Sequence, residues 1–160
     1  MARKKHYWLF KSEPEVYSID DLAADTDQTT HWDGVRNYQA RNLLRDDIKL
    51  GDSVLFYHSR NQPIGVAGEA RVVRSAYPDP TQFDKKSKYF DPKASADVPR
   101  WFVVDIQHVT TYADVIPLAA LKAHPDLTEM MVVQRGARLS VQPVQPAEWK
   151  TVRSLSKKRR

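Results

Sequence analysis

HWDGVRNYQARNLLR, residues 31–45, places a tryptophan directly before an Asp-Gly turn signal and then continues into a short amphipathic pattern. Asn37 is a favourable N-cap, and the apolar residues after it recur at helical spacing, at Ala40, Leu43, Leu44 and Ile48. The stretch therefore predicts a turn followed by a helix whose apolar face packs on a core. Trp32 either packs into that core or offers a flat surface to a ligand, and the pattern alone favours neither role.

Strand patterns lie on both sides of this stretch. Aromatic and β-branched runs bounded by turn residues predict strands at residues 6–13, 53–59, 66–77, 100–112 and 139–144. Apolar and polar residues do not alternate cleanly in the second and third of these runs, which is typical of strands buried on both faces. These features predict an α+β domain built on a small, mostly antiparallel β-barrel flanked by short helices.

Helix signals are short and lie between the strands. A capping-box pattern begins at Ser18, and proline at a first helical position predicts a last helix from Pro146. Further helices are expected after Pro117 and within residues 126–134. The polar segments at residues 25–31 and 85–98 are predicted loops.

The positive charge of the chain is concentrated at its ends. The net charge is +5, and the basic residues at 3–5 and 157–160 carry seven positive charges, so residues 6–156 have a net charge of −2. We therefore predict a basic N-terminal tail at 1–5, one domain at 6–153 and a basic C-terminal tail at 154–160. Such tails attract polyanions, so the overall charge supports nucleic-acid binding only through its ends.

Cysteine is absent, so disulfides and thiolate metal ligands are excluded. No apolar run reaches the roughly 18 residues that a membrane span needs, and the N-terminal apolar stretch is too short for a signal peptide. These features predict a protein that is neither secreted nor membrane-bound, cytoplasmic in a bacterium or nuclear in a eukaryote. A monomer is the favoured oligomeric state.

Signals for catalysis are weak. The five histidines show no metal-ligand spacing, and no P-loop or Gly-x-Ser-x-Gly elbow occurs, so neither a metal nor a cofactor is expected. His58 and Ser59 are adjacent in a strand and point to opposite faces, which places them poorly as a base–nucleophile pair. An enzyme acting on RNA or nucleotides remains the alternative, and it requires Glu13 or His58 as its general base.

Signals for binding are stronger. Trp32 lies beside Asp33, Arg36 and Asn37, and an aromatic ring surrounded by polar groups suits a nucleobase, which stacks on the ring and hydrogen-bonds along its edge. Arg41 and Arg45 lie four residues apart on one helical face, where they either contact phosphates or form a solvated surface.

Six motifs resemble the EVE-domain family in order and spacing, over residues 7–152: YWLFKSEP (7–14), WDGVRNYQARNLLRD (32–46), GDSVLFYHS (51–59), AYPDPTQFD (76–84), PRW (99–101) and RLSVQPV (138–144). The resemblance implies a PUA-like fold and a pocket for a modified base in DNA or RNA. The ligand contacts that it implies are Lys11, Ser12, Glu13, Trp32, Arg36, Asn37, Tyr38, His58, Ser59, Asp79, Pro80, Arg138 and Ser140.

The leading hypothesis is therefore a non-catalytic domain that binds a modified base. Trp32 stacks on the base, Ser12 and Asn37 contact its polar edge, and Arg41 and Arg45 are the candidate phosphate contacts. The alternatives are an enzyme acting on RNA or nucleotides, and a small-molecule sensor that does not bind nucleic acid, which the slightly acidic body favours.

Overall fold

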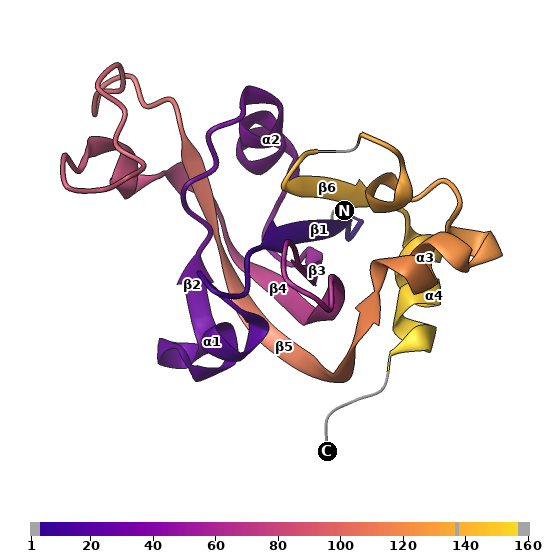
Figure 1. The fold of residues 1–160 in the computed structure, drawn as a ribbon. Helices are drawn as coiled ribbons and strands as arrows, with labels where there is room; N and C mark the ends of the chain where they lie inside the picture. The colour runs from indigo at the N-terminus through magenta and orange to yellow at the C-terminus, as the bar shows by residue number, and fades with distance from the viewer. Residues whose placement is uncertain (1–3, 137, 157–160) are drawn as a thin grey trace.

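The computed structural model describes residues 4–136 and 138–156. Six strands form one mixed sheet in the order β2-β5-β4-β3-β1-β6 (Figure 1). Their bounds are β1 (Tyr7–Ser12), β2 (Thr29–His31), β3 (Ser53–His58), β4 (Gly65–Pro78), β5 (Phe102–Pro117) and β6 (Val141–Val144). Among these strands β1 and β3 pair in parallel, and the other neighbours pair antiparallel. The α+β class and the mostly antiparallel sheet are as expected.

The predicted closure of this sheet into a small barrel is wrong. A barrel requires its first and last strands to pair with each other, but β2 and β6 lie at opposite edges of the sheet. The edge strands are short, with three residues in β2 and four in β6. Helices and turns cover the two apolar faces instead, so burial of both faces does not require the sheet to close on itself.

The strands separate two apolar cores. In β3, Val54 and Phe56 belong to one core, whereas Leu55 and Tyr57 belong to the other. The first core is covered by α1 (Ile19–Ala24), the segment around Trp32, α2 (Tyr38–Asn42) and the π-helical turn η2 (Leu43–Asp47). The second is covered by α3 (Leu118–Ala123), α4 (Pro146–Leu155) and the turns between α3 and β6. In Figure 1, α3 and α4 lie together beyond the end of β5.

Local capping signals identified the helix starts correctly. The Ser18 side chain accepts the Asp21 amide and Asp21 accepts the Ser18 amide, which completes the predicted capping box. The Asn37 side chain accepts the Ala40 amide at 3.0 Å and begins α2. The apolar face predicted after Asn37 is also present, because Ala40, Leu44 and Ile48 are fully buried and Leu43 is partly buried against the same core.

Two segments differ from the prediction. Residues 126–134 form no continuous helix, only the 3-10 turns η4 (Pro125–Leu127) and η5 (Met131–Val133). The segment 25–31 contains the 3-10 turn η1 (Thr26–Gln28) and the strand β2, not only loop. Strand β2 has three residues, of which two are strand-favouring threonines, and its pairing with β5 fixes the extended conformation that so short a polar segment does not specify alone.

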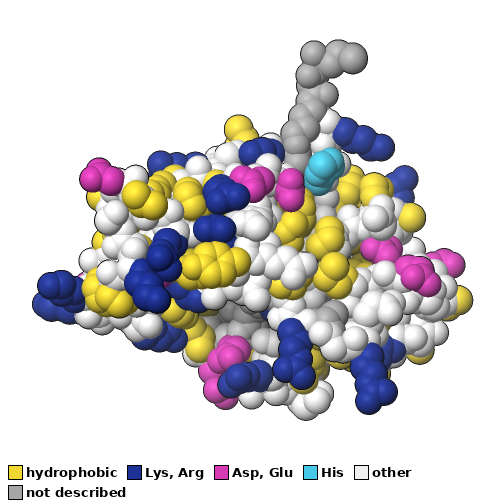
Figure 2. Space-filling model, turned by 90° about the horizontal axis from the view of Figure 1, so that it is seen from above, with side chains coloured by type: hydrophobic (Ala, Val, Ile, Leu, Met, Phe, Trp, Pro, Cys, Tyr) yellow, Lys and Arg dark blue, Asp and Glu magenta, His cyan; other side chains and the backbone are white. Residues whose placement is uncertain are grey.

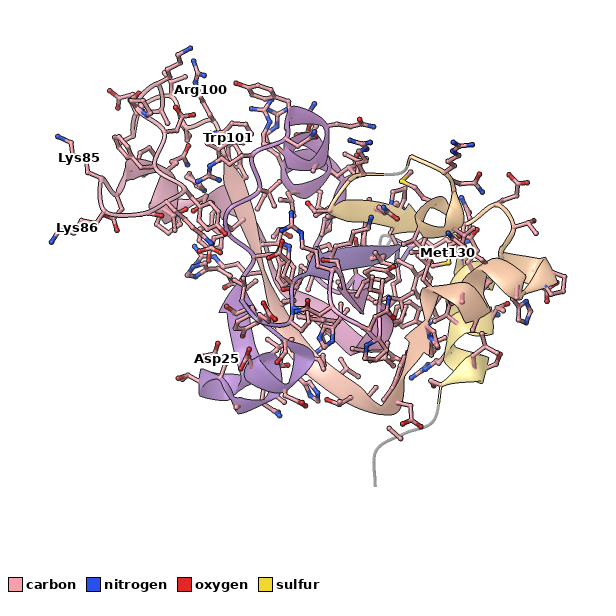
Figure 3. All side chains as sticks on the ribbon, in the orientation of Figure 1. Asp25, Lys85, Lys86, Arg100, Trp101 and Met130 are labelled. Atoms are coloured by element: carbon pink, nitrogen blue, oxygen red, sulfur yellow. The ribbon has the colours of Figure 1, made fainter. Side chains whose placement is uncertain are left out.

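A long excursion joins β4 to β5 and projects from the sheet at the upper left of Figure 1. It begins with η3 (Pro80–Phe83), and residues 85–98 contain no helix or strand, as predicted. The buried Gln82 side chain closes its base by donating to the carbonyls of Asp79 and Trp101 and by accepting the amides of Arg100 and Trp101. The ends of the excursion are therefore fixed to each other, while Lys85 and Lys86 extend from its outer part (Figure 3).

The predicted terminal tails lie mostly outside the described residues, which exclude 1–3 and 157–160. Lys4 and Lys5 are exposed, and α4 continues to Leu155, two residues into the segment predicted as the C-terminal tail. No helix among the described residues has the length and apolar character needed to cross a membrane.

Candidate functional site

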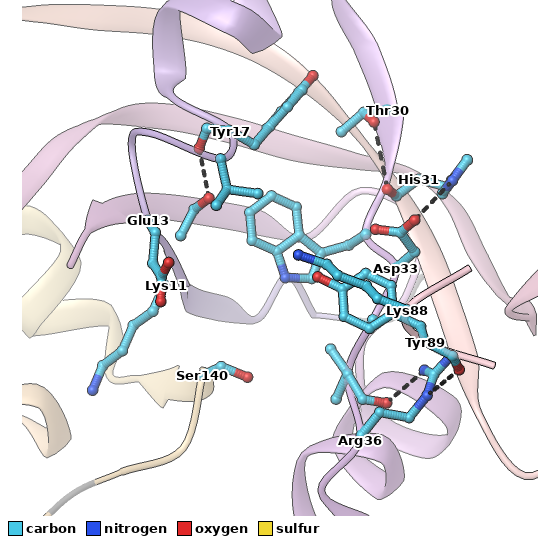
Figure 4. A pocket seen from close by; sticks show the side chains of 15 residues that line it. Lys11, Glu13, Tyr17, Thr30, His31, Asp33, Arg36, Lys88, Tyr89 and Ser140 are labelled. Carbon is cyan, nitrogen blue, oxygen red and sulfur yellow. Dashed lines mark hydrogen bonds and ion pairs between the residues drawn. The ribbon is translucent and has the colours of Figure 1, made fainter. Parts of the chain in front are cut away.

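A cavity of about 530 Å³ opens between the end of β1, the segment that follows β2 and the β4–β5 excursion (Figure 4). This volume lies within the range of about 300–1,000 Å³ that is usual for small-ligand pockets. The lining residues come from four parts of the chain, namely Lys11, Ser12, Glu13, Val16 and Tyr17; residues 30–36; Lys88 and Tyr89; and Ser140 before β6.

Trp32 packs in the core, one of the two roles that its sequence pattern left open, and it also lines the cavity. Its backbone amide donates to the Val104 carbonyl at 2.9 Å, which continues the edge of β2 along β5. Its indole ring lies 5.3 Å from the Phe10 ring and meets Phe56 edge-on at 5.5 Å. Only 8% of Trp32 is exposed, yet it lines the cavity. Trp32 is therefore a core residue whose outer surface forms a wall of the cavity.

Gly34 brings a second aromatic ring to the cavity. Its φ of +79° is strained for other residues, and a Cβ at this position would lie 2.5 Å from the Tyr89 ring. The Tyr89 ring therefore packs directly on the backbone of the Asp33–Gly34 turn. This close approach explains the structural role of the Asp-Gly signal that follows Trp32.

Arg36 fixes the excursion to the wall of the cavity. Its guanidinium donates to the Tyr89 carbonyl from Nε at 3.1 Å and from Nη2 at 2.7 Å. Nη1 donates to the Val35 carbonyl and to Asp79 Oδ2, both at 3.0 Å, and Nη2 also donates to Thr81 Oγ1 at 3.1 Å. A guanidinium has five N–H donors, so these contacts engage all of them within the protein.

Asp79 is the buried anchor of this network. Its side chain is fully buried and accepts the Gly34 amide at 2.9 Å, the Thr81 amide at 2.8 Å and the Thr81 hydroxyl at 2.6 Å, in addition to Arg36. Burial by itself raises the pKa of Asp79, but the hydrogen bonds from Thr81, Gly34 and Arg36 outweigh burial and lower the pKa below its usual value. Asp79 is therefore charged behind the cavity and does not line it.

The other predicted residues that line the cavity come from β1 and from the segment before β6. The Ser12 hydroxyl donates to the Tyr17 carbonyl at 2.5 Å, and the Ser140 hydroxyl points toward the cavity (Figure 4). Glu13 pairs with the exposed Arg60 at 3.1 Å. The Lys11 ammonium points away from the cavity and lies 5.9 Å from the Tyr57 ring centre, and burial lowers its pKa.

Several lining residues were absent from the predicted set. They are Val16, Tyr17, Thr30, His31, Asp33, Gly34, Val35, Lys88 and Tyr89. For His31 and for Asp33 to Val35, adjacency to Trp32 in the sequence was a signal that could have identified them. Lys88 and Tyr89 lie in a polar loop more than fifty residues away, and no periodicity or motif of that loop indicates that it folds over the Trp32 segment.

Other predicted ligand contacts lie outside the cavity lining. Asn37 caps α2, and Tyr38 is 51% exposed and stacks on Trp101 with ring centres 4.8 Å apart. Pro80 begins η3, and Arg138 is exposed. The Ser59 hydroxyl donates to the Ser12 carbonyl at 3.3 Å. None of these predicted contacts lines the cavity, and Asp79 supports its wall from behind through Gly34 and Arg36.

The two predicted phosphate contacts have different surroundings. Arg45 forms two hydrogen bonds of 2.8 Å with the neighbouring Asp46, which neutralises its charge locally. Arg41 lies over the Tyr38 ring at 4.8 Å and donates to Asn42 and to the Arg100 carbonyl. No cluster of three or more potential metal-ligating His, Cys, Asp or Glu side chains occurs among the described residues.

His58 caps α1 instead of facing the cavity. Its Nε2 accepts the Ile19 amide at 3.0 Å, which requires an unprotonated nitrogen at that position. Burial lowers the pKa of His58, and the opposing effect of Asp20 and Asp21 is smaller. The lone pair that general-base catalysis needs is therefore already engaged.

This contact predicts a pH-dependent stability. Because the folded pKa of His58 lies below the unfolded value of about 6.5, the unfolded chain binds the proton more readily, and stability falls as pH decreases below about 6.5. We expect the free energy of unfolding, measured by urea denaturation, to be lower near pH 5.5 than near pH 7.5. His58→Gln retains an acceptor without titrating, so it should reduce this difference, and an unchanged difference would contradict the assignment.

Comparisons with known proteins show which family this chain resembles. A family model described as the EVE domain matches residues 6–155. Human thymocyte nuclear protein 1 is 44% identical over an alignment 168 positions long, which covers 95% of this chain and 74% of that protein.

Two solved structures have nearly the same fold. A Pseudomonas putida protein is 49% identical with a TM-score of 0.89, covering 93% of this chain and 98% of that one. The human THYN1 protein in complex with 5-methylcytosine-containing DNA is 45% identical with a TM-score of 0.88, covering 94% of this chain and 97% of that one. The family match spans almost the whole chain, and the chain therefore belongs to the EVE-domain family.

Proposed function

We propose that this protein binds nucleic acid by taking a modified cytosine, such as 5-methylcytosine, into the cavity beside Trp32. The observation that carries the proposal is the likeness to the human protein in complex with 5-methylcytosine-containing DNA, at 45% identity over 94% of this chain. The cavity supports it, because the aromatic residues Tyr17, Trp32 and Tyr89 and several hydrogen-bonding groups line one space of suitable volume.

The apolar part of the cavity suits a methylated base. Val16, Trp32, Val35 and Tyr89 supply aliphatic and aromatic surface along its walls. Burying one methyl group contributes about 0.8 kcal/mol, which corresponds to about fourfold in Kd. The cavity is therefore expected to favour 5-methylcytosine over cytosine modestly, while stacking on an aromatic wall contributes to the binding of both.

The polar part of the cavity suits the edge of a cytosine. Asp33 lines the cavity, its side chain is 36% exposed, and its carboxylate lies 3.4 Å from His31 Nε2. Carboxylates accept the exocyclic amino group of cytosine, which thymine replaces with a carbonyl oxygen. We assign this contact to Asp33, with the Ser12 and Ser140 hydroxyls completing the polar edge.

The same geometry favours an unpaired base. A base must leave the helical stack before it can enter a cavity of this kind, and extrusion from a duplex costs a few kcal/mol. Single-stranded nucleic acid is therefore expected to bind more tightly than the corresponding duplex.

Three single-stranded DNA ligands test this function. Fluorescence anisotropy would compare oligonucleotides that carry 5-methylcytosine, cytosine or thymine at one central position. We expect 5-methylcytosine to bind about fourfold tighter than cytosine because of its methyl group, and tighter than thymine because of its amino group. Equal Kd values for all three would overturn the proposal.

Asp33→Ala separates base recognition from general electrostatics. If charge alone matters, removing a negative charge strengthens nucleic-acid binding. The control Asp126→Ala, in the exposed turn η4, is expected to behave in this way. If Asp33 accepts the cytosine amino group, Asp33→Ala weakens 5-methylcytosine binding and removes the preference over thymine, while the preference over cytosine persists. A variant that binds more tightly, like the control, would refute the role of Asp33.

A further inference from the structure

A continuous stack of planar groups runs from the cavity to the outer surface. The Arg36 guanidinium lies 5.5 Å from the Tyr89 ring centre and 5.3 Å from that of Trp101. Trp101 stacks on Tyr38 at 4.8 Å, and the Arg41 guanidinium lies over Tyr38, also at 4.8 Å. Arg36 lines the cavity, so the surface at Tyr38 and Arg41 is joined to the cavity through directly packed side chains.

Arg100 joins this surface from the end of the β4–β5 excursion. Its Nη1 donates to the Tyr38 hydroxyl at 3.3 Å, and its carbonyl accepts from Arg41 Nη1 at 2.9 Å. Two guanidinium groups are thus held around one tyrosine that is 51% exposed. Figure 3 places Arg100 and Trp101 where the excursion returns toward the sheet, on the side of α2.

The charges of these two arginines are only partly offset by carboxylates, because the field of Arg100 reaches Asp91 and that of Arg41 reaches Asp46, lowering the pKa of each carboxyl. Within the part of the chain that the structure describes, neither Arg41 nor Arg100 forms an ion pair with a carboxylate, in contrast to Arg45, which pairs with Asp46. Asp91 lies at the base of the surface, where it accepts from Trp101 Nε1 at 2.7 Å. Figure 2 shows Lys and Arg side chains gathered toward this side of the molecule, around exposed hydrophobic side chains.

We propose that Arg41 and Arg100 bind the backbone phosphates of the strand whose base occupies the cavity. A guanidinium has five N–H groups. The hydrogen bonds described above engage Nε and Nη1 of Arg41 and Nη1 of Arg100, and arginine matches phosphate geometry bidentately. Residues 6–156 carry a net charge of −2, so contacts between a polyanion and the folded body depend on a local basic surface. The inference rests on the proposed function, since it requires a strand at the cavity.

Salt dependence tests the phosphate contacts. The observed affinity for single strands falls with salt by a slope of about 0.7 per neutralised phosphate. The double variant Arg41→Gln, Arg100→Gln should therefore reduce the slope for the 5-methylcytosine oligonucleotide by about 1.4 between about 50 and 200 mM KCl, and weaken binding by about tenfold or more at about 100 mM. The ratio of Kd values for cytosine and 5-methylcytosine should not change, because both ligands have the same backbone.

Two comparison variants make this result specific. The double variant Lys122→Gln, Lys150→Gln removes the same charge from exposed positions of α3 and α4, over the second core. It should change the salt slope much less than the arginine double variant does. Arg41→Lys, Arg100→Lys retains the charge and should restore most of the slope, while thermal melting checks that each variant is folded.

The outcomes separate the two proposals. Suppose that the unaltered protein binds the strand and prefers 5-methylcytosine, but that the arginine and lysine double variants to Gln reduce the salt dependence of binding equally. The phosphate surface is then refuted, and the base pocket remains. If the unaltered protein binds no oligonucleotide, the proposed function fails, and the phosphate surface fails with it. DNA and RNA versions of the strand show whether the surface distinguishes the two sugars.

Discussion

Arg36→Met is expected to lower the free energy of unfolding by about 3–5 kcal/mol, the usual cost of leaving one partner of a buried ion pair uncompensated. Asp79 is fully buried beside Arg36 at 3.0 Å, and the charge of its carboxylate has no access to solvent. The substitution also removes the donors to the Tyr89 carbonyl and to Thr81. Urea denaturation monitored by circular dichroism measures the loss.

A matched arginine provides the control for this prediction. Arg45→Met removes the same side chain from an exposed pair with Asp46, and exposed pairs contribute little to stability. Combining Arg36→Met with Asp79→Asn should recover part of the loss, because the uncompensated charge is then absent. If Arg36→Met is as stable as Arg45→Met, the Arg36–Asp79 network does not hold the excursion in place.

Trp32→Ala is expected to lower the free energy of unfolding by about 3–5 kcal/mol, as truncation of a buried tryptophan usually does. The indole packs on Phe10 and Phe56, so its removal leaves a void between the sheet and the segment that forms the cavity. Chemical denaturation measures the effect. A loss below about 1 kcal/mol would instead indicate a ligand platform that the core does not need, since surface substitutions usually change stability by about half that amount.

This stability effect decides how Trp32 is tested for binding. A Trp32→Ala variant that fails to bind a base does not distinguish a lost stacking surface from a disrupted fold. Trp32→Phe retains an aromatic ring against Phe10 and Phe56 and reduces the stacking area, so it is the better binding variant. Tyr38→Ala truncates a half-exposed aromatic side chain and is expected to cost less stability than Trp32→Ala.

Much of the fold followed from local patterns. Capping by Ser18 and Asn37, the proline before α4 and the runs of β-branched and aromatic residues each depend on interactions within a few residues. Sheet closure was not predictable in this way. The same two-sided apolar strands suit a barrel or an open sheet covered on both faces, and only the pairing of distant strands distinguishes them.

The lining of the cavity was predicted in part. The motifs that resemble the EVE domain included Ser12, Trp32 and Ser140, which the structure brings to one cavity. They also included Asn37, His58 and Asp79, whose side chains instead cap helices or anchor the wall. A motif marks residues that a family needs near its site, and it does not separate groups that face the cavity from groups that hold it.

The amino-acid sequence by itself determined the α+β class, most helix starts and the family, because these depend on short-range patterns and on the order of motifs along the chain. The tertiary structure decided that Trp32 is both core and cavity wall, that Arg36 is engaged internally, and that Tyr89 and Arg100 approach the Trp32–Tyr38 segment. The physical reason is distance along the chain. Arg36 and Tyr89 are 53 residues apart, and only packing of the excursion on the Asp33–Gly34 turn brings their groups into contact.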